Sequence, residues 1–249
     1  MSTYLFPPPP VAALPVRGLA QLFPVRRLFF VGRNYAAHAA EMGFTVDKSR
    51  ETPFYFTKSI SALAPSGSTL PYPPGTRNFH YEVELVLALH QGGFEVSPEQ
   101  APALIYGYGV GLDMTRRDLQ QAARELGRPW DLGKDVEHGA VCSELLPLPG
   151  LVLAPAAIVL QVNGQTRQQA STGQLIWSIP ELIADLSRFY HLQPGDLIYT
   201  GTPEGVGPVQ PGDQLRGWVE GVGEVHTCVV GATEGACPAT AASTLGRPL

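Results

Sequence analysis

Short apolar runs separated by glycine, proline and polar turns dominate the hydrophobic pattern of this chain. Runs with the length and composition of β-strands lie at residues 28–31, 53–60, 81–89, 105–112 and 159–162. Two Pro-Gly-Asp turns, at 194–196 and 211–213, each precede another strand-like run, and residues 221–230 complete a meander. The pattern therefore predicts a protein rich in β-structure.

Two short helices are predicted from their capping residues. Asn34 is expected to cap a helix that runs to about Met42 and ends at Gly43. Ser178 and Glu181 have the spacing of a capping box, which marks the start of a second helix. The apolar stripe of that helix consists of Leu182, Ile183, Leu186 and Phe189.

A further helix is predicted from about residue 115 to residue 126. Thr115 and Asp118 resemble a capping box at its start. Residues at helical spacing form an apolar stripe, which we expect to pack on the body of the protein. The stripe consists of Leu119, Ala122, Ala123 and Leu126.

The composition indicates one domain with two less regular ends. A chain of 249 residues with 44% hydrophobic content can bury one sizeable core. Residues 1–24 include the run Pro7–Pro10 and form an expected extended arm, whereas residues 231–249 lack a hydrophobic pattern and are expected to be a flexible tail. The catalytic body is therefore assigned to residues 25–230.

Charge and targeting signals exclude several classes of function. The net charge of −5 and the absence of Lys or Arg runs argue against binding to nucleic acid or to anionic membranes. No signal peptide and no membrane-spanning apolar stretch is apparent. The cysteines lack disulfide-framework or zinc-site spacing, which favours a reducing cytoplasm; they are Cys142, Cys228 and Cys237.

Paired carboxylates in one strand carry the strongest chemical signal. Alternation in the run 81–89 places Glu82 and Glu84 on the same face, about 7 Å apart along the backbone. Such a pair is more often a solvated strand face, but here the flanking residues are apolar on both faces, so the strand is expected to be buried. Two buried carboxylates repel each other unless a cation neutralises them.

Asp113 supplies a third carboxylate at the end of the run 105–112. It could instead cap the following helix, although Thr115 is available for that purpose. Three carboxylates without a Cys/His cluster favour Mg²⁺ or Mn²⁺, with Ca²⁺ as a weaker candidate and zinc disfavoured.

His38 and Glu41 are spaced i, i+3 on the first predicted helix and can therefore touch. A carboxylate beside an imidazole orients the ring and makes it a better base for deprotonating water. The alternative is a surface ion pair. In addition, Arg117 and Gln120 share a helix face that could grip a substrate, while Lys134 offers a cation.

The glycine-rich loop 200–208 allows close backbone approach to a bound anion. It lacks the Lys-Ser/Thr ending of a P-loop, and no strand–GxGxxG–helix unit is present. Nucleotide and dinucleotide binding are therefore not supported.

The chain resembles the fumarylacetoacetate hydrolase family over about residues 25–230. The resemblance rests on Lys134 and on four segments in the family's order, which are RNYAAHAAEMG, YEVELVLAL, GLDMTRRDLQ and YTGTPEGVGP. Within the family, the Pro-rich arm and the segments PVRRLFFVGRNYAAHAAEMGF and GRPWDLGKD look most like the members that hydrolyse fumarylpyruvate in gentisate-type aromatic catabolism.

The resemblance implies an α+β, mostly β fold, a mixed β-roll or sandwich with a few short helices, in a homodimer. It implies that the metal ligands are Glu82, Glu84 and Asp113, that His38 and Glu41 activate water with Lys134 as a further catalytic residue, and that Arg33, Tyr35, Arg117, Gln120 and Thr202 contact the substrate. The chain departs from the family at 135–141, where Phe-Asp-x-x-Ala-Pro is common, and at Ser59 after Lys58, where proline is common.

The expected function is metal-dependent hydrolysis of a carbon–carbon bond in a β-diketo acid. His38, oriented by Glu41, would take a proton from the water that attacks the distal carbonyl, and a pyruvate enolate would leave. One alternative is a keto-acid decarboxylase or isomerase on the same scaffold, such as one acting on oxaloacetate. Another is a metal-stabilised binding protein that has lost turnover, although such a protein has no need of an acid–base pair.

Overall fold

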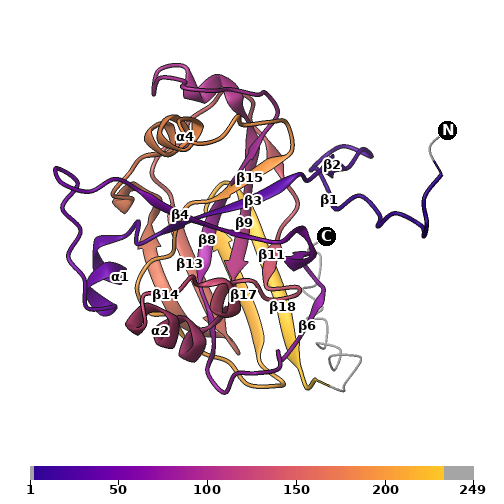
Figure 1. Cartoon of the computed structure of the whole chain (residues 1–249), viewed down its shortest axis with the longest axis vertical. Coiled ribbons are helices and arrows are strands. Elements are labelled where there is room, and N and C mark those ends of the chain that lie inside the picture. The colour runs from indigo at the N-terminus through magenta and orange to yellow at the C-terminus, as the bar shows by residue number, and fades with distance from the viewer. Residues whose placement is uncertain (1–2, 233–249) are drawn as a thin grey trace, which may run out of the picture.

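A computed structural model describes residues 3–232 of the chain (Figure 1). The described part is mostly β-structure with a few short helices, which confirms the α+β, mostly β fold class. Almost all of the predicted tail, 231–249, lies outside the described residues. The division into arm, body and tail stays a prediction.

The largest sheet has eight strands and is mixed in direction. Its strands in spatial order are β4 (Phe54–Lys58), β3 (Arg27–Gly32), β15 (Asp196–Tyr199), β8 (Val83–Leu89), β9 (Ile105–Asp113), β11 (Ala140–Cys142) and β5 (Leu63–Pro65), with β12 (Leu146–Pro147) also paired to β9. The pairs β15–β3 and β11–β5 are parallel, whereas β8 pairs antiparallel with both of its neighbours. Strand β8 is therefore central, and every residue in it is buried.

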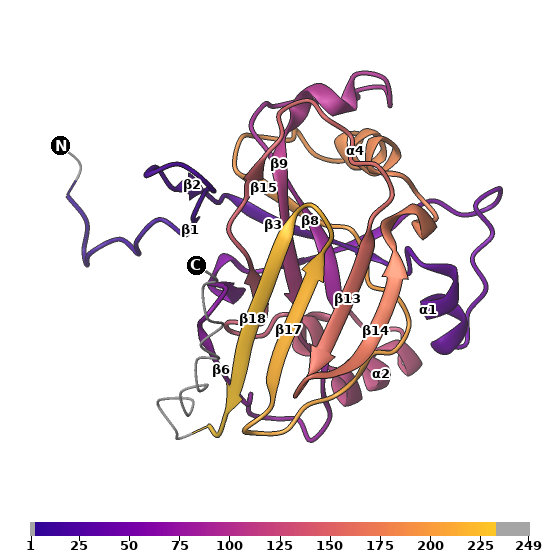
Figure 2. The same cartoon turned by 180° about the vertical axis from the view of Figure 1, so that it is seen from behind.

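A five-stranded sheet packs against one face of the larger sheet, as Figure 2 shows from behind. Its strands in order are β14 (Gln165–Ser171), β13 (Ala157–Val162), β17 (Gln214–Val219), β18 (Gly223–Val230) and β6 (Thr69–Pro71). Val83, Leu85 and Leu87 of β8 join the core between the two sheets. Because side chains alternate along a strand, Glu84 and Val86 point to the opposite face.

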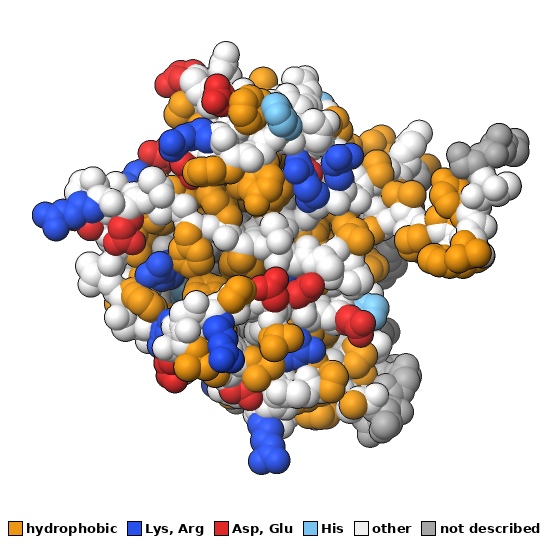
Figure 3. Space-filling model, in the orientation of Figure 1, with side chains coloured by type: hydrophobic (Ala, Val, Ile, Leu, Met, Phe, Trp, Pro, Cys, Tyr) orange, Lys and Arg blue, Asp and Glu red, His pale blue; other side chains and the backbone are white. Residues whose placement is uncertain are grey.

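Two small sheets complete the β-structure. One contains β10 (Thr115–Arg116), β7 (Phe79–Tyr81) and β16 (Gly207–Pro208), and the other contains β1 (Ala13–Leu14) and β2 (Phe23–Pro24). The segment before β1 extends away from the body and exposes hydrophobic side chains, seen at the right of Figure 3.

The helices are short. The α-helices are α1 (Ala36–Glu41), α2 (Arg117–Glu125), α3 (Asp131–Lys134) and α4 (Ile179–Ser187), and the 3₁₀ helices are η1 (Ile60–Ala62), η2 (Ala101–Leu104) and η3 (Thr172–Gln174). The predicted capping box of Ser178 and Glu181 at α4 is confirmed, although Phe189 is exposed. Within residues 3–232, no helix is long and apolar enough to cross a membrane.

Two predictions about helix ends were wrong. Tyr35, and not Asn34, precedes α1, because the Asn34 side chain instead bonds backbone groups of Trp177 and Thr200. Thr115 lies in β10, and Asp118 accepts hydrogen bonds from Thr76 and from its own first turn. The side chains of Asn34 and Asp118 form hydrogen bonds with residues far away in the sequence. Local spacing does not reveal such partners.

The predicted packing face of α2 was also wrong. Its buried residues are Arg117 and Gln120, whereas Leu126 of the apolar stripe is 63% exposed. The helix therefore turns a polar face inward, which is the first indication that it borders a polar site.

The cysteines differ from the expectation. Cys142 is a buried free thiol, whereas Cys228 takes part in a disulfide. The bonded state of Cys228 gives no support to a reducing compartment, and the cytoplasmic location stays a prediction.

Gly111 of β9 lets the central strands approach the ring of Tyr199. A Cβ atom at this position would lie 2.4 Å from Tyr199 Cε1 and 2.7 Å from Val86 Cγ2. We expect Gly111→Ala to lower the free energy of unfolding by about 1–3 kcal/mol, because the core beside Glu84 has no room for the methyl group. Urea denaturation measures this loss. Gly109→Ala is the matched control on the same strand, where the shortest contact would be 3.1 Å, so an equal loss in both variants would contradict this account.

Candidate metal centre and active site

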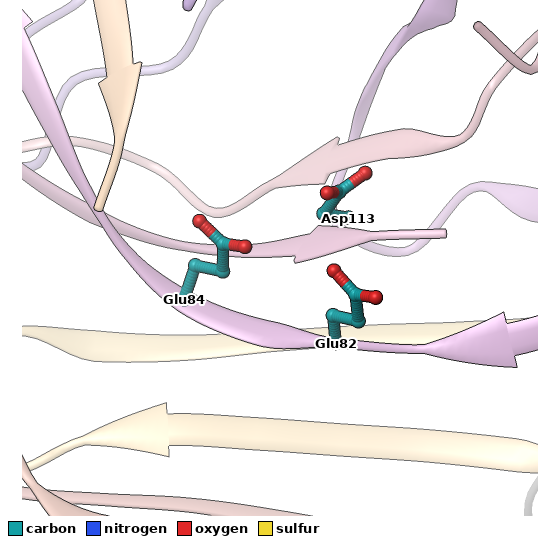
Figure 4. A group of neighbouring side chains, drawn as sticks. All are labelled: Glu82, Glu84 and Asp113. Carbon is teal, nitrogen blue, oxygen red and sulfur yellow. The ribbon is translucent and has the colours of Figure 1, made fainter. Parts of the chain in front are cut away.

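Three buried carboxylates lie close together at the start of β8 and the end of β9. Glu82 immediately precedes β8, Glu84 lies within it, and Asp113 ends β9 (Figure 4). The exposed fraction of each residue is 4% or less, and one carboxylate oxygen from each lies within 4.8 Å of the others. The antiparallel β8–β9 pair creates this arrangement, since Glu84 lies opposite Gly111, two residues before Asp113. The sequence therefore identified the carboxylate cluster correctly.

Three cations of the protein already face this cluster. The Lys134 ammonium donates to Glu82 at 2.7 Å, to Asp113 at 2.6 Å and to Thr115 at 2.8 Å. Arg117 pairs with Glu82. The cation that the sequence analysis expected beside the buried carboxylates is therefore supplied in part by basic side chains of the protein itself.

Lys58 is the third cation, and it was not among the predicted site residues. Its Nζ lies 2.6 Å from Asp113 Oδ1 and donates to the carbonyl oxygens of Met114 and Gly139. Burial lowers the pKa of Lys58. Its signal in the sequence was a lysine that ends the mostly aromatic strand β4, where a buried charged group needs a partner.

Glu84 is the one of the three carboxylates that has no cationic hydrogen-bond partner among residues 3–232. It accepts a hydrogen bond from the Gly201 N–H at 2.7 Å. Burial, followed by repulsion from Asp113 and Glu82, raises the pKa of Glu84 well above its ordinary value. For Glu82, burial acts in the same direction, but attraction to Lys134 and Arg117 outweighs it and lowers the pKa. Glu84 is thus the group that a further cation would stabilise most.

The donor set fits a hard divalent cation. Oxygen ligands of three convergent carboxylates suit Mg²⁺ or Mn²⁺, which also keep open positions for water or substrate. Asp113 Oδ1 is buried and has no partner with hydrogen-bond geometry among the described residues, despite the nearby Lys58 ammonium. An ion that shares this oxygen with Glu84 would satisfy both groups.

His38 and Glu41 form the predicted pair on α1. His38 Nδ1 lies 3.0 Å from Glu41 Oε2, and the imidazole is buried, whereas Glu41 is at the surface. Glu41 also accepts a hydrogen bond from the Gly205 N–H at 3.0 Å. Glu41 is therefore held from two sides, and the second ring nitrogen of His38 remains for a proton transfer.

The glycine-rich loop binds carboxylates of the protein itself. Its amides at Gly201 and Gly205 donate to Glu84 and Glu41 respectively. Gly205 has φ of +90°, and a Cβ there would lie 2.2 Å from the carbonyl oxygen of Arg167. The predicted close backbone approach to an anion is present, but the anions belong to the metal site and to the His38 pair.

One pocket joins these groups. It is partly open to solvent and combines convergent polar groups with hydrophobic walls, which suits a small organic acid. The predicted site residues that line it are Arg33, His38, Glu82, Glu84, Asp113, Arg117, Gln120, Lys134 and Thr202. Hydrophobic walls come from Val31, Met42, Phe44, Phe54, Phe56 and Trp130.

Some residues that were predicted to contact the substrate either lie outside the pocket or already bond other groups of the protein. Tyr35 does not line the pocket; its buried hydroxyl has no hydrogen-bond partner within residues 3–232, and burial raises its pKa. Arg117 holds both Glu82 and the Gln120 side-chain oxygen, and the three donors of Lys134 are all used. Arg117 and Lys134 therefore position the carboxylates. Contacts of Tyr35, Arg117, Gln120 and Lys134 with a substrate stay predictions.

Metal affinity should depend on pH because of Glu84. Its raised pKa means that the metal-free site holds a proton at pH values where an ordinary glutamate, with a pKa of 4.5, is ionised. A divalent cation has to displace that proton, so we expect affinity to rise with pH, by up to about tenfold per unit below the raised pKa. Calorimetric titration with Mn²⁺ in two buffers of different ionisation enthalpy measures the released proton. Affinity that is independent of pH, with no proton release, would contradict this prediction.

Comparison with known proteins agrees with the geometry of the site. Residues 27–230 match the family model described as fumarylacetoacetate hydrolase C-terminal. A fumarylpyruvate hydrolase from a Ralstonia species is 61% identical over 188 residues, covering 76% of this chain and 98% of that protein. A mitochondrial oxaloacetate tautomerase from Arabidopsis thaliana is 40% identical over 202 residues, covering 80% of this chain and 89% of the relative.

A solved structure shows the same fold. The crystal structure of fumarylpyruvate hydrolase from Pseudomonas aeruginosa, in complex with Mn²⁺ and pyruvate, superposes with a TM-score of 0.87 at 50% sequence identity. The match covers 92% of this chain and 99% of that one.

Proposed function

The chain belongs to the fumarylacetoacetate hydrolase family, and from this membership we propose that it hydrolyses fumarylpyruvate to fumarate and pyruvate. The observation that carries the proposal is the arrangement of the pocket, in which the His38 imidazole and the three carboxylates line one small cavity. The high identity to a fumarylpyruvate hydrolase supports this substrate over other acylpyruvates.

His38 provides the base for the reaction. His38 Nδ1 donates a hydrogen bond to Glu41 Oε2, which leaves His38 Nε2 to take a proton from a water molecule in the pocket. The water oxygen adds to the carbonyl carbon of the fumaryl group, and the bond between that carbon and the pyruvate methylene breaks. Protonation of the departing carbanion gives pyruvate, and fumarate is the acid product.

The other residues of the chain hold the charges in place. A divalent cation bound by the three carboxylates supplies Lewis-acid polarisation and stabilises developing negative charge. Lys134 and Arg117 keep Glu82 ionised and oriented, and the Gly201 amide orients Glu84. Phe54, Phe56 and Trp130 exclude water from one wall, which strengthens the electrostatic interactions inside.

A tautomerase acting on oxaloacetate is the second candidate. The Arabidopsis relative favours it, since that protein carries this name and shares 40% identity. Interconversion of keto and enol forms needs a base and the metal but no attacking water. A non-catalytic binding protein is disfavoured, because His38 and Glu41 are both held in working geometry.

Product analysis tests the proposal. The purified protein is given fumarylpyruvate, acetylpyruvate and oxaloacetate with Mg²⁺, with Mn²⁺ and with a chelator, and products are followed by nuclear magnetic resonance. Equal amounts of fumarate and pyruvate, formed only with metal, are expected. Enol–keto exchange of oxaloacetate without cleavage of fumarylpyruvate would contradict the hydrolase function and favour the tautomerase function.

Further properties complete the proposal. Mg²⁺ or Mn²⁺ is the proposed cofactor, with Ca²⁺ a weaker candidate, because Mn²⁺ is present in the related crystal structure and oxygen ligands suit all three ions. We also propose that the protein is a cytoplasmic homodimer that serves aromatic catabolism of the gentisate type. Sedimentation of the purified protein measures its oligomeric state.

A further inference from the structure

A polar stripe on α2 runs from the metal site along the pocket. Arg117, Gln120, Gln121 and Arg124 are spaced i, i+3, i+4 and i+7, and all four line the cavity. Seven residues of helix rise by about 10 Å, so Arg124 lies roughly that far along α2 from the Arg117 that holds Glu82. The pocket therefore has a second basic region, two turns of helix away from the carboxylates.

Arg33 reaches the same region from the turn after β3. Its guanidinium carbon lies 4.4 Å from the centre of the Phe44 ring and 4.8 Å from that of Phe54. Arg124 lies 5.2 Å from the same Phe44 ring. Arg33 adopts φ of +56°, a left-handed conformation that is uncommon for arginine, so the backbone is strained where it directs this side chain. Both guanidinium groups thus share one aromatic support, and on the face shown in Figure 3 basic and hydrophobic side chains lie side by side over α1 and α2.

Neither arginine forms an ion pair with a carboxylate of residues 3–232. Arg124 makes a long contact, 3.4 Å, with the carbonyl oxygen of Met42, and Arg33 has contacts with the two aromatic rings. Stacking occupies the face of a guanidinium and leaves the N–H groups along its edge free for a planar anion. By contrast, Arg117 in the same pocket already donates hydrogen bonds to Glu82 and Gln120.

We propose that Arg124, together with Arg33, binds the distal carboxylate of the acyl group and selects acylpyruvates that end in a second carboxylate. The inference rests on the proposed function and deepens it, because it names the feature of fumarylpyruvate that the pocket recognises. In an extended fumarylpyruvate the two carboxylates are separated by a chain of five carbons. With the keto-acid end at the metal site, the distal carboxylate extends along α2 toward Arg124.

Two substrates that differ only at the distal end test this assignment. Crotonylpyruvate carries a methyl group where fumarylpyruvate carries its second carboxylate. In Arg124→Gln and Arg33→Gln, we expect kcat/KM for fumarylpyruvate to fall about 10- to 100-fold, mainly through KM, while the value for crotonylpyruvate changes less than about threefold. Arg128→Gln is the matched control, since Arg128 follows α2, is exposed and does not line the pocket.

A parallel loss with both substrates would show a structural role for the two arginines and overturn the proposal. An unchanged preference in both variants would overturn it as well. Melting temperatures of the variants identify any that fail to fold, and Arg124→Lys, which keeps the charge, should recover part of the preference.

A binding measurement separates this proposal from the proposed function. Calorimetry compares fumarate with crotonate as ligands of the Mn²⁺-loaded protein, and the preference for fumarate should disappear in Arg124→Gln. If the unmodified protein turns over no acylpyruvate yet binds fumarate through Arg124, the proposed reaction fails while the carboxylate site stands. If fumarate and crotonate bind equally to the unmodified protein, the carboxylate site fails whatever the reaction.

Discussion

The Glu84→Gln protein is expected to lose metal-dependent turnover by at least roughly 10³-fold, because the substitution removes the one carboxylate of the three that bonds no cationic side chain in the described part of the chain. Glutamine keeps the shape of the side chain, so the loss would report on charge. Mn²⁺ binding, measured by calorimetry, should weaken in the same variant.

The same substitution should stabilise the metal-free protein. Since the pKa of Glu84 is raised in the folded state, ionisation costs stability as pH rises from 4.5 toward the raised value, and the full cost applies above that value. Glutamine carries no charge at any of these pH values and avoids the cost. Thermal unfolding in the presence of a chelator should therefore show an equal or higher melting temperature for Glu84→Gln. Glu224→Gln, at an exposed ion pair with Arg216, is the control and should change neither the Mn²⁺ affinity nor the melting temperature. An unchanged Mn²⁺ affinity in Glu84→Gln would refute the role of Glu84 as a ligand.

His38→Ala should lower kcat by roughly 10²-fold or more while Mn²⁺ still binds, since the imidazole supplies the base but no ligand of the carboxylate site. Glu41→Gln should cause a smaller loss, because the ring remains but its orientation and basicity change. Steady-state kinetics with fumarylpyruvate, beside a Mn²⁺ titration, measure the two effects separately.

His191→Ala provides the matched control for the imidazole. His191 lies against Phe94 at the surface, with ring centres 4.1 Å apart and the rings tilted by 30°, and it does not line the pocket. A His38→Ala enzyme with the full turnover of the His191→Ala enzyme would remove His38 from the mechanism and leave the tautomerase as the better assignment.

The carboxylate cluster was predictable because it depends on local periodicity. Glu82 and Glu84 share a strand face at a spacing of two residues, and apolar neighbours on both faces indicated burial. The same holds for His38 and Glu41, whose contact requires one helical turn. Information of this kind is contained in a short segment.

The neutralising cations were not predictable in the same way. Lys58 and Lys134 reach Asp113 from distant parts of the chain, and their positions depend on how the sheet and α3 pack. The orientation of α2 was misjudged for a related reason. Its apolar stripe predicted that this face would pack on the body, yet the polar face with Arg117 and Gln120 is buried and lines the pocket. When a helix borders a polar site, the spacing of its apolar residues alone does not determine which face is buried.

Anomalous diffraction from crystals soaked with Mn²⁺ would locate the metal directly. One strong manganese peak is expected, bonded to oxygen atoms of Glu82, Glu84 and Asp113, with Lys134 still paired to the ligands. A pocket without manganese at saturating concentration, or a peak that shares no ligand with Glu84, would contradict this expectation.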